Sequence, residues 1–129
     1  MKPANIFINL AIGAISTISL AQTSRFKAFV LTEEGGQHGP FVMAPLDWMG
    51  KLSAEYNFSC DVIHTADSIT DDFLYQYDVF IQLNYPPYSW PDEAMDAFKK
   101  YIETGKGGGW VGFHHATLLG EFDGYPIWQ

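Results

Sequence analysis

Apolar residues along this chain gather in four short runs separated by longer amphipathic stretches. The runs predict β-strands over residues 26–32, 60–64, 78–84 and 110–113. The fourth run, Trp110–Phe113, contains no polar residue, which is typical of a parallel strand that helices cover on both faces. Loops rich in glycine or proline follow the first and third runs, at residues 33–40 and 85–90.

Between these runs, apolar residues recur at the spacing of an α-helix. One helix is predicted to start near Val42, with Pro45 in its first turn, because proline lacks the N–H that later turns need. A second helix is predicted from Pro91 to Gly105, with acidic residues in its first turn and glycine at its end. Residues 68–74 predict a short capped helix or turn. The apolar faces of the two longer helices comprise Leu46, Met49, Leu52 and Tyr56, and Ala94, Phe98, Tyr101 and Ile102.

Strands and helices alternate along the chain, so the predicted fold class is α/β, with a doubly wound, mainly parallel sheet. Connections between parallel strands are expected to be right-handed crossovers. Ligands of such sheets bind outside the carboxyl ends of the strands. The residues that follow each predicted strand are therefore the first candidates for a functional site.

Residues 1–21 predict a secretory signal peptide. Lys2 precedes an apolar stretch that is short for a membrane span, and Ser19 and Ala21 offer small residues at the −3 and −1 positions of a cleavage site. The alternative is an ordinary N-terminal helix. With a signal peptide, residues 22–129 form the mature domain, which would be exported, periplasmic or secreted, and would have no membrane attachment after cleavage.

Size and charge narrow the classes of function. The 129 residues, 47% of them hydrophobic, suffice for one domain with a core. A formal net charge of −8 gives no electrostatic support for binding a phosphate backbone, so nucleic acid is not an expected partner. The single cysteine, Cys60, cannot close an intrachain disulfide and is expected to be a packed, inert thiol.

Adjacent histidines follow the fourth predicted strand. His114 and His115, with Glu33 after the first strand, are the predicted catalytic residues, because imidazole transfers protons near neutral pH. The two histidines are also candidate ligands of a divalent metal such as zinc, and Glu33, Glu121 and Asp123 would complete its shell. Neighbours on a regular strand point to opposite faces, so both histidines reach one site only if the strand turns there. His64, the last residue of the second predicted strand, is expected to face solvent.

Aromatic residues around Pro86 and Pro87 suggest a surface on which a sugar ring could stack. The alternative is that these rings only pack a rigid loop in place. The predicted substrate-binding residues are His38, Asn84, Tyr85, Tyr88, Trp90, Glu121 and Asp123.

Three segments together resemble a known family. They are residues 30–41, residues 78–85 with the sequence Asp-Val-Phe-Ile-Gln-Leu-Asn-Tyr, and Gly112–Ala116. On these segments the chain resembles a ThuA-like (trehalose-utilisation) domain of the class I glutamine amidotransferase-like superfamily. The resemblance implies a flavodoxin-like sheet and a carbohydrate-related role.

The chain departs from the related patterns in three places. Amidotransferases of this fold present a cysteine in the turn that matches Gly112–Ala116, and no cysteine is present here, so amidotransferase activity is not expected. Gln37 stands where the family often has histidine. ThuA-like domains also continue beyond the segment that ends at Gln129, which predicts an incomplete, N-terminal portion of the fold whose exposed sheet edge self-associates.

The predicted function is therefore that of an exported ThuA-like domain that acts on a small saccharide at a histidine-centred site. Whether it is an enzyme is left open. A non-catalytic carbohydrate-binding or interaction module is the alternative, and a flavodoxin-like cofactor binder is a third class.

Overall fold

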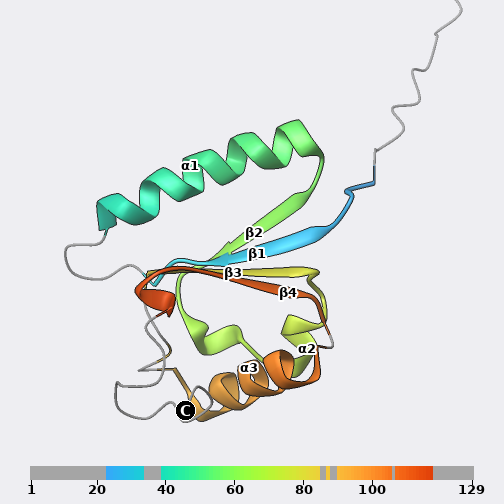
Figure 1. The fold of residues 1–129 in the computed structure, drawn as a ribbon, viewed down its shortest axis with the longest axis vertical. Coiled ribbons are helices and arrows are strands. Elements are labelled where there is room, and N and C mark those ends of the chain that lie inside the picture. Colours follow the sequence, from blue (N-terminus) through green and yellow to red (C-terminus); the bar gives the residue numbers. More distant parts are fainter. Residues whose placement is uncertain (1–22, 34–38, 85–86, 88–89, 106, 118–129) are drawn as a thin grey trace, which may run out of the picture.

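Four parallel strands form the centre of the computed structural model, which describes residues 23–33, 39–84, 87, 90–105 and 107–117. The sheet has the order β2-β1-β3-β4 (Figure 1). The order and the parallel pairing confirm the predicted doubly wound α/β fold. The strands are β1 (Lys27–Leu31), β2 (Ser59–Ile63), β3 (Val79–Asn84) and β4 (Gly109–His114).

Helices lie on both sides of the sheet. α1 (Gly39–Tyr56) covers one face, and α2 (Asp71–Leu74) and α3 (Asp92–Thr104) lie on the other (Figure 1). Two short 3-10 turns, η2 (Ala66–Ser68) and η3 (His115–Thr117), follow β2 and β4. None of the helices in the described residues is long and apolar enough to cross a membrane.

The ends of α2 and α3 match the sequence prediction. The side chain of Thr70 accepts a hydrogen bond from the backbone N–H of Phe73, which caps α2. Gly105 ends α3 in the left-handed conformation, with φ of 61°, and donates to the carbonyl of Tyr101.

The predicted start of α1 was wrong. The helix begins at Gly39 rather than near Val42, so Pro45 lies inside it and not in the first turn. Pro40, at the second helical position, is the proline that needs no N–H partner. Pro45 leaves one backbone acceptor of the preceding turn without its helical partner.

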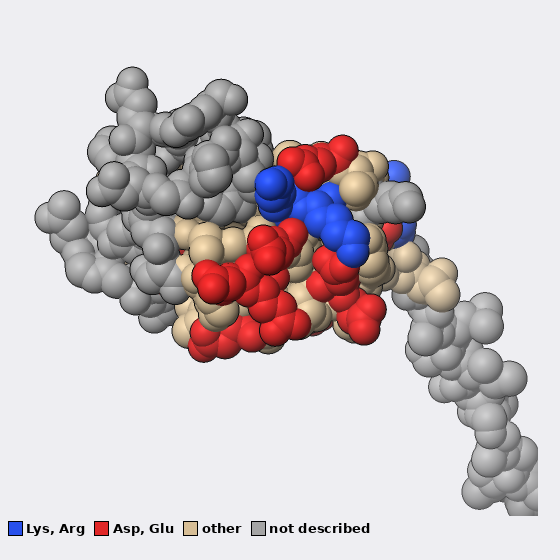
Figure 2. Space-filling view, turned by 90° about the horizontal axis from the view of Figure 1, so that it is seen from below, with Lys and Arg blue, Asp and Glu red and all other residues tan. Residues whose placement is uncertain are grey.

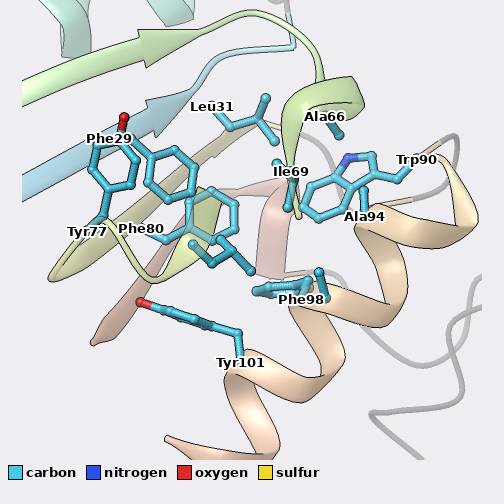
Figure 3. Packing of buried hydrophobic residues seen from close by; sticks show 12 residues of the cluster. Phe29, Leu31, Ala66, Ile69, Tyr77, Phe80, Trp90, Ala94, Phe98 and Tyr101 are labelled. Atoms are coloured by element: carbon cyan, nitrogen blue, oxygen red, sulfur yellow. The ribbon is translucent and has the colours of Figure 1, made fainter. Parts of the chain in front are cut away.

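The main core lies between the sheet and α3. Phe29 stacks on Phe80 at a centroid distance of 4.4 Å, and Phe98 of α3 meets Phe80 edge-on at 5.5 Å. Figure 3 shows these rings together with Trp90 and Tyr101. Half of the buried residues in this cluster are aromatic, and their rings pack α3 against β1 and β3.

The opposite face is covered less completely. Its buried cluster joins Met49 of α1 to Ala28, Val30, Ile81 and Leu83 of β1 and β3. Among the described residues, β4 is covered on both faces only in part, because Val111 and Phe113 are 43% and 42% exposed. The reason is that the buried cluster under α1 ends at β3.

Two further expectations concern the N-terminal region and the cysteine. The predicted signal peptide, residues 1–21, lies outside the described residues. Cys60 is half-buried and packs against the cluster under α1, which agrees with the expected packed thiol. It lies on β2, an edge strand of the described sheet, where neighbours cover one side only. Burial and the neighbouring Asp61 raise the pKa of the thiol, which keeps it in its unreactive protonated form.

Candidate functional site

The carboxyl ends of β1, β3 and β4 meet at one edge of the sheet. Glu33 follows β1, Asn84 ends β3, and His114 ends β4 as the register partner of Asn84. Strand order reverses between β1 and β3, which is the point where doubly wound sheets bind ligands. At about 4.8 Å between neighbouring strands, the ends of β1 and β4 lie about 10 Å apart.

Glu33 is held in an unusual position. Its φ of 42° places it in the left-handed region, which residues other than glycine rarely adopt. Its Oε1 accepts a 2.7 Å hydrogen bond from Nε1 of Trp90. Its Oε2 is buried and has no hydrogen-bond partner in the structure, and among the described residues it is the one such side-chain atom.

Burial raises the pKa of Glu33 from 4.5 to about 7, while the hydrogen bond from Trp90 lowers it by a smaller amount. A carboxyl group with this pKa exists in both protonated and ionised forms near neutral pH. Such a group can give up or accept a proton during a reaction at that pH. Glu33 therefore has the protonation behaviour of a general acid or base.

His114 and His115 come together because β4 turns at His114. The φ of His114 is 57°, and η3 begins at the next residue. The two rings lie 3.9 Å apart between centroids, and the ring of His114 lies 5.0 Å from that of Phe41 at the start of α1. The hydroxyl of Thr117 donates to the carbonyl of His114 at 2.9 Å, which closes the turn. The turn that the sequence required for both histidines to reach one site is therefore present.

One contact at this edge was not predicted from the sequence. Thr32 is wholly buried at the end of β1, and its Oγ1 lies 3.0 Å from Nδ1 of His64, which follows β2. His64 is exposed, as expected, but it is also joined to the strand that carries Glu33. Its position at the carboxyl end of a predicted strand was the signal available in the sequence, and the same kind of signal identified His114.

Trp90 serves the core rather than an open binding surface. Its side chain is buried, 5.5 Å from Phe98 between ring centroids, and it donates to Glu33. Trp90 therefore fits the alternative in which these aromatic rings pack the loop in place. For Asn84 the structure describes the backbone alone. The remaining predicted binding residues, His38, Tyr85, Tyr88, Glu121 and Asp123, lie outside the described residues.

A metal at His114 and His115 stays a prediction. Within the described ranges, no three His, Cys, Asp or Glu side chains lie close enough together to hold a metal ion. Two imidazoles supply half of a tetrahedral zinc shell, so zinc would need ligands from Glu121, Asp123 or other residues outside these ranges. We expect about one equivalent of zinc by elemental analysis of untagged protein if both histidines are ligands. Less than about a tenth of an equivalent would contradict a metal role.

Comparison with known proteins agrees with this arrangement. Residues 27–129 match the model of the ThuA family, whose description is trehalose utilisation. The crystal structure of a ThuA-like protein from Bacteroides uniformis ATCC 8492 is similar, with a TM-score of 0.71 and 31% sequence identity. The match covers 84% of this chain and 43% of that one, so this chain spans less than half of that protein's length. Among curated proteins, none matches. Because the family model matches most of its length, the chain belongs to the ThuA family.

Proposed function

We propose that this chain is an exported carbohydrate-processing domain that binds a small saccharide at the carboxyl edge of its sheet. Glu33 and His114 are its proton-transfer groups, and His115 orients His114. Membership of a family described as trehalose utilisation supports the substrate class. The signal-peptide pattern in residues 1–21 supports export.

The proposal rests on the positions at which the backbone is strained. Among the described residues, three that are not glycine have positive φ, namely Glu33, Asn57 and His114. Asparagine and histidine adopt this conformation more often than other side chains do, but a residue other than glycine holds it at a cost of about 1–3 kcal/mol, and such residues cluster at active sites. Glu33 and His114 stand at the carboxyl ends of β1 and β4. The strain therefore coincides with the predicted catalytic residues.

The two groups lie at the ends of different strands. β3 lies between β1 and β4, so these strand ends are about 10 Å apart. Glu33 is able to give a proton to a sugar oxygen and take it back, because its pKa is about 7. The single cysteine, Cys60, is the second residue of β2 and lies near the amino ends of the strands, so it does not supply a nucleophile at this edge.

Replacing His114 with alanine is the first test. We expect turnover of trehalose, or of whichever saccharide the wild type consumes, to fall by about 10²- to 10⁴-fold, because a proton-transfer group is lost. Sugar affinity, measured by calorimetry, should change little. The control is Lys51→Ala, at an exposed position on α1, which should leave both quantities unchanged.

The rival function, a non-catalytic carbohydrate-binding module, predicts a different pattern. The wild type would then bind sugar without consuming it, as followed by NMR of the sugar. If His114→Ala and His115→Ala both leave binding and turnover unchanged, the histidine-centred site is wrong. Visible flavin absorbance of the purified protein would instead favour a cofactor binder.

A further inference from the structure

The two carboxyl oxygens of Glu33 have different surroundings. Oε1 accepts the 2.7 Å hydrogen bond from Nε1 of Trp90, whereas Oε2 is buried without a partner. Rotation about the terminal bond of a glutamate side chain is otherwise broad, so the bond from Trp90 fixes the plane of the carboxyl group. One oxygen is thus held by the protein, and the other has the capacity to bond to a ligand.

Packing holds the ring of Trp90 itself in place. The residue is 5% exposed, and its ring lies 5.5 Å from Phe98 and 6.3 Å from Phe80 between centroids. Figure 3 shows it in the cluster between the sheet and α3, and the next residue, Pro91, is the N-cap of α3. A donor on a ring packed in this way has a fixed direction. Trp90 is too buried for a sugar to stack on it, so any effect on a substrate passes through Glu33.

The same side of the sheet contains a second bond of this kind. Trp110 donates from Nε1 to Oε1 of Gln82 at 3.1 Å, and its ring lies 5.8 Å from Phe98. In both pairs an indole N–H donates to a side-chain oxygen while the ring packs against Phe98. The acceptor of Trp110 is a neutral amide, which does not exchange protons near neutral pH. The second pair therefore shows what such a bond does when it serves packing alone.

Charged groups elsewhere do not fix Glu33 in the way that Trp90 does. Acidic side chains of α2 and α3 spread over the outer side that these helices form (Figure 2). The described titratable side chains at the neighbouring element ends are at least partly exposed, so solvent screens their charges. They are His64, Asp92, Glu93, His114 and His115. Among the described residues, burial and then the bond from Trp90 set the pKa of Glu33.

We propose that Trp90 is the positioning residue of Glu33, whose Oε1 it holds so that Oε2 gives a proton to a sugar oxygen and takes it back. This inference rests on the proposed function, in which Glu33 transfers a proton. A substrate hydroxyl supplies the hydrogen-bond partner that Oε2 lacks. Because Trp90 does not touch the substrate, its loss lowers the rate of reaction and leaves substrate affinity unchanged.

Trp90→Phe and Trp110→Phe form a matched pair, because each loses one indole N–H and keeps a ring against Phe98. Trp90→Phe should lower kcat by about 10- to 100-fold, with KM within about twofold of the wild type, for trehalose or the disaccharide of a test panel that the wild type consumes. The pKa of Glu33 should rise above about 7, because the bond from Trp90 lowers it. The limb of the pH–rate profile that reports Glu33 then moves to higher pH. Trp110→Phe should leave kcat, KM and the profile unchanged.

A second measurement does not require Trp90→Phe to fold. In NMR spectra of protein with isotope-labelled tryptophan, one indole N–H signal should titrate with Glu33 in the wild type and stay constant in Glu33→Gln. If no indole signal behaves in this way, the inference is overturned. Equal kcat and pH–rate profiles for Trp90→Phe and Trp110→Phe overturn the inference alone. If the wild type consumes no disaccharide of the panel, the proposed function fails and the inference falls with it.

Discussion

Replacing Gly108 with alanine should destabilise the chain by more than about 4 kcal/mol, a large part of the 5–15 kcal/mol that stabilises a typical domain. Gly108 has φ of 133°, which side chains rarely adopt, and an added Cβ would lie 1.9 Å from the carbonyl oxygen of Asp78. That oxygen accepts a hydrogen bond from Gly109 at 2.8 Å, and the backbone N–H of Asp78 donates to Lys27 at 2.7 Å. Asp78 is therefore tied to both β1 and β4 and cannot move away without breaking the pairing of the sheet.

Gly109→Ala is the control, because no atom lies within 4 Å of the added Cβ and no positive φ is required there. It should change stability by less than about 1 kcal/mol. Thermal and urea unfolding, followed by circular dichroism, compare the two variants with the wild type. Similar midpoints for both variants would show that the tight passage between α3 and β4 is not needed for folding.

Replacing Glu33 with glutamine should make the chain more stable than the wild type above pH 7, with a smaller difference near pH 4. The pKa of Glu33 is about 7 in the folded chain, against an ordinary value of 4.5. Between these values the folded state holds a proton that the unfolded state has released, so wild-type stability falls as pH rises. The full difference corresponds to about 3 kcal/mol, and partial solvent screening reduces the expected loss to about 1–2 kcal/mol.

Glutamine is neutral at every pH in this range and retains an oxygen that can accept from Nε1 of Trp90. The pH-dependent loss should therefore disappear in the variant. Urea unfolding at pH values from 4 to 8 measures it, and Glu55→Gln, at an exposed position on α1, is the control that should follow the wild type. Parallel stability curves for wild type and Glu33→Gln would contradict the raised pKa. If Glu33 is also catalytic, the same variant should lose turnover while gaining stability, as expected where an active site is strained.

Local pattern in the sequence determined the elements of this fold. Apolar runs located the four strands to within one or two residues, and Gly105 marked the end of α3 at the residue where the structure has the left-handed cap. The alternation of strands and helices was enough to predict a doubly wound parallel sheet, because few topologies accommodate it. The rule that ligands bind at strand carboxyl ends placed Glu33 and His114 at one edge. These are short-range signals, or general rules of chain topology.

Tertiary structure decided what depends on contacts between distant segments. Glu33 and Trp90 are 57 residues apart, and their hydrogen bond exists because β1 and β3 are neighbours in the sheet. The raised pKa of Glu33 follows from burial, which no local pattern reports. The same is true of β4, whose apolar run is equally compatible with full or partial cover; the buried cluster under α1 ends at β3, so Val111 and Phe113 are exposed. Hydrophobic periodicity shows that a side chain favours burial, but only the packed arrangement decides whether another element is there to bury it.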